Sequence, residues 1–471
     1  MKVESVFLLR VSSPVDKDVD HPQFFDPPYP LKYLQAGLKQ YPDVRVGLLD
    51  CWTRPQSVSE MVNQTMEIEP DLVVVSASSF DVDIANDYVA RLRGRKKSPL
   101  IIGIGQGYYL NGVRVKDFAA KYDAILLGEP EHEFFQLFGQ IRDADDPARW
   151  QGHYRNLYNE GKRFSVEEPD RLPFPSYTEE ELNIYRSIFP VQVPRRVVWG
   201  YLIATRGCPH NCMFCSEVMR VSTGKRLRIR SAASVADEME HLARQGANIC
   251  SFQDDSFSAS RRFVQSLCEE LIARNSKMPW MARVRVDELS YDLLASMKKA
   301  GCVMLGLGVE SGSERIIKII QKQQGAKPWI DLCRQAFGWT RALGIGTNAY
   351  YVLGNPTETR EEIEQTIKLA LELNSDSIQV HFYTPYPGSS AWEEYRDQLV
   401  GCDPAAMFHY AKPAFSLAAV SPDELVEIRS RFYRRYLFRP SFAFNHLRRH
   451  GAFYYHNPDI FWRLLGIRKI L

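Results

Sequence analysis

Short hydrophobic runs alternate with helical patterns along the first 140 residues of the chain. Several runs are apolar without the polar alternation of a half-exposed strand, so we expect strands that are covered on both faces. Such strands are typical of a parallel sheet whose connecting helices pack on it. The predicted strands are residues 5–9, 44–49, 72–76, 100–104 and 124–127.

Small polar residues and glycines follow three of these predicted strands. In an open parallel sheet the ligand crevice lies beyond the carboxyl ends of the strands, so a large ligand could approach the backbone there. The alternative is a nucleotide-type fold that holds no cofactor or a different one, because glycines after strands are common. The residues concerned are Ser76, Ser78, Ser79, Gly103, Gly105, Gly107, Gly128 and Glu129.

A second alternation of strands and amphipathic helices runs from about residue 197 to 382. Six strand–helix units cannot close an eight-stranded barrel, so we expect a partial (β/α)6 barrel with its chemistry at the carboxyl ends of the strands. The predicted strands are residues 200–205, 249–253, 281–286, 303–309, 345–353 and 377–382.

Composition and proline content complete the domain prediction. Residues 1–140 form the Rossmann-like unit, the proline-containing residues 141–195 a linker, residues 196–404 the barrel and residues 405–471 a helical extension. The 471 residues carry a net charge of only +2, which gives no argument for nucleic acid. No run of about 18 apolar residues occurs, and the apolar start is too short for a signal peptide. Nine cysteines fit reduced thiols, so we expect a cytoplasmic protein.

Three cysteines, Cys208, Cys212 and Cys215, lie within eight residues directly after the first predicted barrel strand. They offer three thiolates to a four-iron cluster, and the other six cysteines are scattered singly, so one iron would stay open to an organic ligand. A structural zinc site with His210 as the fourth ligand is the alternative. Zinc motifs usually pair two short ligand clusters across a longer loop, which this segment does not do.

The spacing of the three cysteines, with Phe214 before the last one, resembles the motif of the radical S-adenosylmethionine (radical SAM) enzymes. The resemblance implies a 4Fe-4S cluster bound by Cys208, Cys212 and Cys215, which are then the catalytic centre. In that family the open iron chelates SAM, and an electron from the cluster splits the sulfonium to a 5′-deoxyadenosyl radical.

Polar strand ends elsewhere in the barrel resemble those of cobalamin-linked radical SAM enzymes, down to the turns GNPTET at residues 354–359 and PYPG at residues 385–388. By that resemblance Arg283 or Arg285 would hold the SAM carboxylate. Glu310 and Ser311 would bind the ribose or the ammonium group, and Gly354 would let the adenine approach. The residues implied for SAM are Phe214, Asp254, Asp255, Arg283, Arg285, Glu310, Ser311 and Gly354.

Each of these residues also has a structural interpretation. Asp254 and Asp255 could cap the following helix, Glu310 could begin the next one, and Gly354 could belong to a simple turn. The functional hypothesis depends on five polar strand ends that converge on one mouth of the barrel.

The amino-terminal pattern resembles the cobalamin-binding domain that precedes one class of radical SAM enzymes. The matching segments are PPYPL at residues 27–31, PDLVVVS at residues 70–76 and YDAI at residues 122–125. The resemblance implies that cobalamin binds at the strand ends named above. The sequence lacks D-x-H-x-x-G, because Val19 lies two positions before His21, so the cobalt is expected to lack a histidine ligand.

The extension combines basic and aromatic residues. From Ser421 onward it holds ten Lys or Arg against four acids, interleaved with Phe, Tyr and Trp. This composition suits a membrane surface, a lipid-like substrate mouth or nucleic acid. We favour a helical cap whose aromatics pack on the barrel, because long aromatic runs are more often core. Residues 431–440 also resemble the tail of relatives that act on tetrapyrroles and polycyclic lipids.

Taken over nearly the whole chain, the resemblance implies a cobalamin-dependent radical SAM enzyme that methylates an unactivated carbon of a small molecule, a lipid or a natural-product intermediate. One SAM would methylate the cobalamin, and a second would generate the radical that activates the substrate. Its partners would be that substrate and an electron donor such as flavodoxin or ferredoxin, with no nucleic acid and with membrane contact through the tail left open.

Two other classes of function remain. Within the family, the enzyme could cyclise, contract a ring or oxidise its substrate with no methyl transferred. A methylthiotransferase is disfavoured, because the amino-terminal region offers only Cys51 for a second cluster. Outside enzymology, the alternative is a zinc-stabilised adaptor with a basic aromatic tail.

Overall fold

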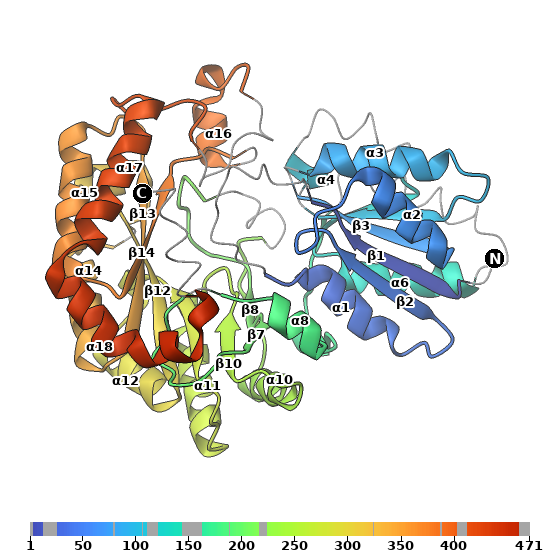
Figure 1. Cartoon of the computed structure of the whole chain (residues 1–471), viewed down its shortest axis with the longest axis horizontal. Coiled ribbons are helices and arrows are strands. Elements are labelled where there is room, and N and C mark those ends of the chain that lie inside the picture. The colour runs from blue at the N-terminus through green and yellow to red at the C-terminus, as the bar shows by residue number, and fades with distance from the viewer. Residues whose placement is uncertain are drawn as a thin grey trace.

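Two α/β units lie beside one another, and two long helices pack on the outer side of the second (Figure 1). The computed structural model describes residues 3–12, 26–78, 81–105, 107–110, 121–143, 163–187, 189–215, 224–323, 325–386, 389–402 and 412–460.

The amino-terminal unit is a six-stranded parallel sheet of order β2-β1-β3-β4-β5-β6. Its first five strands are the predicted ones within a residue or two, and they confirm the Rossmann-like class. The strands are β1 (Ser5–Arg10), β2 (Arg45–Asp50), β3 (Leu72–Ser76), β4 (Leu100–Ile104), β5 (Ala124–Gly128) and β6 (Arg163–Phe164). The order reverses at β1, where a ligand crevice is expected beside β3.

Both faces of this sheet are buried, as the unbroken apolar runs predict. Phe7 and Leu9 belong to one hydrophobic core and Val6 and Leu8 to another, because successive side chains point to opposite faces. The helices that supply these cores are α1 (Tyr29–Leu38), α2 (Val58–Ile68), α3 (Val82–Arg93) and α6 (Glu131–Asp143).

The second unit is a partial barrel. Its six-stranded sheet has the order β14-β13-β12-β11-β10-β7, so neighbours in the chain are neighbours in space and every pairing is parallel. This confirms the (β/α)6 prediction. The strands are β7 (Trp199–Leu202), β10 (Ile249–Phe252), β11 (Trp280–Val284), β12 (Cys302–Glu310), β13 (Gly346–Leu353) and β14 (Ser377–Phe382).

The barrel helices begin at local sequence signals. Ser231, Ser260, Ser290 and Thr359 each accept a hydrogen bond from a backbone N–H of the first turn, which satisfies a donor that the helix leaves open. The helices that follow these caps are α10 (Ala232–Arg244), α11 (Arg261–Ala273), α12 (Tyr291–Lys299) and α15 (Arg360–Leu373), and α14 (Trp329–Ala342) lies between the last two.

A buried ionic cluster joins the two units. Glu129 and Glu131 follow β5, and they pair with Arg206 and Arg228 of the short antiparallel strands β8 (Thr205–Arg206) and β9 (Arg228–Ile229). Each of these side chains is at most 8% exposed, so removal of one partner would leave a desolvated charge. The predicted linker also contributes β6, and Glu129 accepts the backbone N–H of Val166 there.

The extension forms α17 (Pro422–Leu437) and α18 (Pro440–His456), which pack beside α15 and β14 (Figure 1). Phe432, Tyr436, Phe442 and Phe453 are buried in the barrel core, as a helical cap requires. Tyr436 donates a hydrogen bond to the Ser375 carbonyl at 2.6 Å. None of the described helices is both long and apolar enough to cross a bilayer.

The substitution Phe432→Ala tests the cap. Phe432 is fully buried, so we expect a loss of about 3–5 kcal/mol in the free energy of unfolding, measured by urea denaturation. Phe438, six residues further on, is 72% exposed, and Phe438→Ala should change stability by no more than about 0.5 kcal/mol. Equal effects of the two substitutions would contradict this packing.

Candidate functional site

The loop with the three cysteines leaves the carboxyl end of β7 through β8. Gly207 opens it with a φ of +91°, and a Cβ there would lie 2.3 Å from the carbonyl oxygen of Arg226. Only glycine fits this conformation without strain. Backbone bonds then fix the loop: Cys208 N–H donates to Gly224 O, and Met213 N–H donates to Ile320 O.

Two carboxylates after β10 hold the entry to this loop. Asp254 accepts the backbone N–H groups of Ala204 and Thr205, and Asp255 accepts that of Gly207 at 3.1 Å. Burial raises the pKa of Asp254 to about 7, although the hydrogen bonds from Thr205 and Ala204 oppose the shift. The helix-cap interpretation of these residues is wrong, because Ser260 caps α11.

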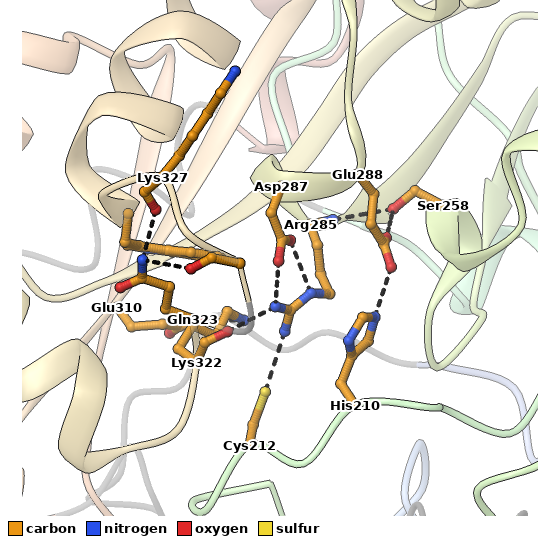
Figure 2. A network of polar contacts seen from close by, with 12 residues as sticks. His210, Cys212, Ser258, Arg285, Asp287, Glu288, Glu310, Lys322, Gln323 and Lys327 are labelled. Atoms are coloured by element: carbon orange, nitrogen blue, oxygen red, sulfur yellow. Dashed lines mark hydrogen bonds and ion pairs between the residues drawn. The ribbon is translucent and has the colours of Figure 1, made fainter.

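Arg285, just after β11, reaches Cys212 of the cysteine loop (Figure 2). Its Nη1 donates to Cys212 Sγ at 3.2 Å, and its Nε and Nη2 donate to the Asp287 carboxylate at 3.0 and 2.8 Å. Nη2 also donates to the Lys322 carbonyl at 2.7 Å. These bonds engage four of the five guanidinium N–H groups, so Arg285 has little capacity left for a ligand carboxylate.

Cys208 lies in the same neighbourhood. Burial raises the pKa of the Cys208 thiol, while the His210 backbone hydrogen bond and the Arg285 charge lower it. The thiol form is therefore favoured in the metal-free chain, and metal binding would release a proton here.

Glu310 ends β12 in a strained conformation. Its φ is +67°, at a register shift between Gly308 and Glu310, and such a conformation costs about 1–3 kcal/mol outside glycine. Lys322 donates to its carboxylate at 2.8 Å, and the Lys322 ammonium stands 5.7 Å from the centre of the Phe214 ring. Glu310 does not begin the next helix, because α13 (Glu314–Ile319) is capped by Ser313.

Ser311 and Gly354 make contacts within the barrel and its helices. The Ser311 hydroxyl meets that of Thr366 on α15 at 3.2 Å and accepts the N–H of Ser313. Gly354 has a φ of +82°, and a Cβ there would lie 2.9 Å from Leu425 of α17. The structure thus gathers Phe214, Asp254, Asp255, Arg285 and Glu310 around the cysteine loop, but gives Ser311 and Gly354 structural contacts.

Sequence patterns missed Lys322, Trp329 and Glu288. The Trp329 ring lies under both cations, 5.4 Å from Arg285 and 5.6 Å from Lys322. Lys322 and Trp329 lie outside strand ends, so no periodicity marks them. Glu288 is reached by His210 Nε2 at 2.6 Å and by the Ser258 hydroxyl (Figure 2).

The donor set suits a cluster better than a zinc ion. His210 pairs with Glu288, and among the described residues no three His, Cys, Asp or Glu side chains gather closely enough to hold one metal ion. A zinc ion needs four ligands around one point, whereas a four-iron cluster takes each thiolate on a different iron. Three thiols on one anchored loop, beside a guanidinium, fit the second case.

The strand ends of the amino-terminal unit form a second candidate site. Ser76, Ser78, Gly105 and Gly107 meet at the carboxyl edge of β3 and β4, where a Cβ on Gly105 would lie 2.6 Å from Ala77 O. Gly107 N–H donates to the same oxygen at 3.0 Å. The glycines thus let two chain segments touch. Ser79 lies outside the described residues.

Three predicted cobalamin residues occupy other surroundings. A Cβ on Gly103 would lie 3.1 Å from the Tyr108 ring, and one on Gly128 would lie 2.3 Å from Phe164 O of β6. The Glu129 side chain is in the ionic cluster between the units. A role of these three residues in binding cobalamin stays a prediction.

Known proteins resemble the chain both in its barrel segment and over nearly its whole length. The model of the radical SAM superfamily matches residues 202–370, which include the cysteine loop and the strands β10 to β13. This segment therefore has the radical SAM domain. The chain is 25% identical to an uncharacterized methyltransferase, PH0819, of Pyrococcus horikoshii, over 91% of each chain. It is 24% identical to an anaerobic magnesium-protoporphyrin IX monomethyl ester cyclase of Cereibacter sphaeroides, over 94% of this chain and 70% of the relative.

A solved structure shares the fold of this chain over nearly its whole length. The radical SAM methyltransferase TsrM of Kitasatospora setae, solved with cobalamin and a [4Fe-4S] cluster, superposes with a TM-score of 0.68 and 17% identity. The match covers 94% of this chain and 90% of TsrM. It confirms the fold class of the sheet unit, the barrel and the helical extension.

The pH dependence of stability tests the position of Asp254. Its pKa is about 7 when folded and 3.8 ordinarily, so the folded chain keeps a proton that the unfolded chain releases. The contribution of Asp254 to the free energy of unfolding is fully present below pH 3.8. It falls as the pH rises toward 7, by at most about 1.4 kcal/mol per pH unit. In Asp254→Asn urea unfolding between pH 4.5 and 6.5 should show a shallower slope, and the remainder comes from groups such as Glu358, whose pKa burial also raises to about 7.

The exposed carboxyl Asp292 provides the control, since Asp292→Asn should retain the wild-type slope. A slope in Asp254→Asn as steep as that of the wild type would show that Asp254 titrates normally in the folded chain.

Proposed function

We propose that this chain is a cobalamin-dependent radical SAM methyltransferase that acts on an unactivated carbon. The anchored loop of three thiols carries the proposal, because it leaves a four-iron cluster one protein ligand short. When bound, the cofactors supply the 5′-deoxyadenosyl radical and the methyl group, and the protein's part is placement.

The residues of the barrel perform that placement. Cys208, Cys212 and Cys215 would bind the cluster, and the Arg285 N–H donates to the Cys212 sulfur. Hydrogen bonds to cluster sulfurs tune the reduction potential. Glu310 and Phe214, linked by Lys322, would flank the SAM. The proposed domain limits remain residues 1–140, 141–195, 196–404 and 405–471.

The crevice at the switch point of the amino-terminal sheet would receive cobalamin. Ser76, Ser78, Gly105 and Gly107 lie at this edge, and TsrM binds cobalamin with a similar fold. The buried pairs of Glu129 and Glu131 with arginines of β8 and β9 would keep this edge at a fixed distance from the cysteine loop.

Cyclisation without methyl transfer is the second candidate function, favoured by the likeness to the magnesium-protoporphyrin ester cyclase. Product mass separates the two functions. Methyl transfer adds one carbon and consumes two SAM, which gives both S-adenosylhomocysteine and 5′-deoxyadenosine, whereas cyclisation adds no carbon.

Radical SAM enzymes take a small-molecule substrate and an external electron donor. For this chain we propose a flavodoxin or ferredoxin as donor, and the cytoplasm as location stays a prediction.

A lipid-like substrate would agree with an outer surface of α18 that exposes Phe444, Leu447 and Tyr455 by 69%, 59% and 81%. Arg448 stands on the same face, so we propose that this surface contacts anionic lipid.

Removal of the loop thiols tests the cluster. After anaerobic reconstitution with iron, sulfide, cobalamin and SAM, the wild type should be brown and form 5′-deoxyadenosine. The triple variant Cys208→Ala, Cys212→Ala, Cys215→Ala should lack the colour and form no detectable 5′-deoxyadenosine. Cys402→Ala, outside the loop, is the control and should behave as wild type. Activity in the triple variant would end the proposal.

Vesicle sedimentation tests the α18 surface. The full chain should co-sediment with vesicles that contain phosphatidylglycerol and remain in solution with pure phosphatidylcholine, and salt should weaken the binding. The double variant Phe444→Asp, Leu447→Asp should bind these vesicles at least tenfold more weakly than the wild type. Val400→Asp, at another exposed apolar position, is the control. Equal sedimentation of both variants would refute lipid contact.

A further inference from the structure

Arg283 stands two residues before Arg285 and differs from it in its partners. Arg283 lies within β11, whereas Arg285 lies just beyond the end of the strand. Arg283 is exposed, although its neighbours Ala282 and Val284 are buried and β11 lies within the six-stranded sheet. Its side chain is therefore accessible to a ligand.

Residues from both units surround this guanidinium. Tyr350 of β13 and Tyr201 of β7 lie near it, and so do Asp26 and Tyr29 at the start of α1. We call these residues the Arg283 cluster. A Cβ on Gly306, between the strands, would lie 2.9 Å from the Tyr350 ring and 3.3 Å from Arg283 Cγ, so the glycine makes room for both.

The cluster holds donors that the described chain does not use. The hydroxyls of Tyr29 and Tyr201 are buried and have no hydrogen-bond partner among the described residues. A buried hydroxyl without a hydrogen-bond partner is unfavourable, so a ligand that accepts these bonds gains affinity.

Among the described residues Arg283 also has no ion pair. Within the described ranges no carboxylate oxygen lies within 4.0 Å of its guanidinium nitrogens, whereas Arg206, Arg228 and Arg230 are all paired. Asp26 is near but not in contact. Burial raises the pKa of Asp26, and the charges of Arg283 and Arg10 oppose that shift.

We propose that the Arg283 cluster binds a carboxylate or phosphate group of the substrate, with Arg283 as the cation and the hydroxyls of Tyr29 and Tyr201 as further donors. The inference rests on the proposed function only in that the occupant is the substrate. Arg285, two residues further along the chain, contacts Cys212, so the Arg283 cluster and the cysteine loop both adjoin the carboxyl-terminal part of β11. An anion at Arg283 would orient the rest of the molecule toward the radical.

Binding of small fluorinated probes to the full chain tests this proposal without SAM. The probes are 4-fluorobenzoate, 4-fluorophenyl phosphate and, as a neutral control, 4-fluorobenzamide, observed by 19F NMR titration. At least one anion should bind the wild type, and the amide should bind at least tenfold more weakly. The anion that binds more tightly shows whether the site prefers a carboxylate or a phosphate group of the substrate.

Variants locate the binding. Arg283→Gln should weaken the preferred anion at least tenfold, equivalent to about 1.4 kcal/mol, and Arg283→Lys should restore part of the affinity. Arg262→Gln removes an exposed arginine of α11 and should bind as the wild type does. Circular dichroism checks that each variant is folded. Equal anion affinity in the wild type and Arg283→Gln would overturn the proposal.

SAM titration of the same variants separates this inference from the proposed function. If Arg283→Gln kept the anion but lost SAM affinity, Arg283 would serve the SAM carboxylate and the proposal would be overturned. A wild type that binds the anion at Arg283 but never cleaves SAM would refute the proposed function and leave the anion site standing.

Discussion

The position of the cysteine loop depends on hydrogen bonds that two buried strand ends direct at it. The carboxylates of Asp254 and Asp255 accept hydrogen bonds from backbone N–H groups at the start of the loop. Arg285, just after β11, donates a hydrogen bond to the second cysteine, Cys212. Since these groups follow neighbouring strands of one sheet, the sheet register itself sets the loop. An iron with an open coordination position must be held in a defined place so that its ligand binds in one orientation. A loop fixed by backbone hydrogen bonds can hold the iron in this way, and a freely moving loop could not.

The second constraint lies between the units. The carboxylates after β5 and the arginines of β8 and β9 are desolvated and mutually paired, and Arg206 immediately precedes the glycine that opens the loop. The crevice of the parallel sheet and the mouth of the barrel are thus tied through adjacent residues. The Arg283 cluster also draws its members from both units.

The sequence allowed most of the fold to be predicted, because unbroken apolar runs mark strands buried on both faces whatever their partners. It missed β6, whose two residues pair through the backbone and leave no hydrophobic pattern. In the site, the sequence pattern located the residues next to strand ends, but it could not predict which neighbours their side chains contact. Ser311 faces Thr366, and Glu310 depends on a positive φ and on Lys322, twelve residues away. These features arise from contacts that periodicity does not encode.

The most direct test of the central claim is the EPR spectrum of the reduced, reconstituted chain before and after addition of SAM. A cluster held by three thiolates has a vacant iron, so the account predicts one four-iron signal whose g-values shift when SAM binds. An unchanged signal, or a protein that takes up zinc and no iron, would contradict it.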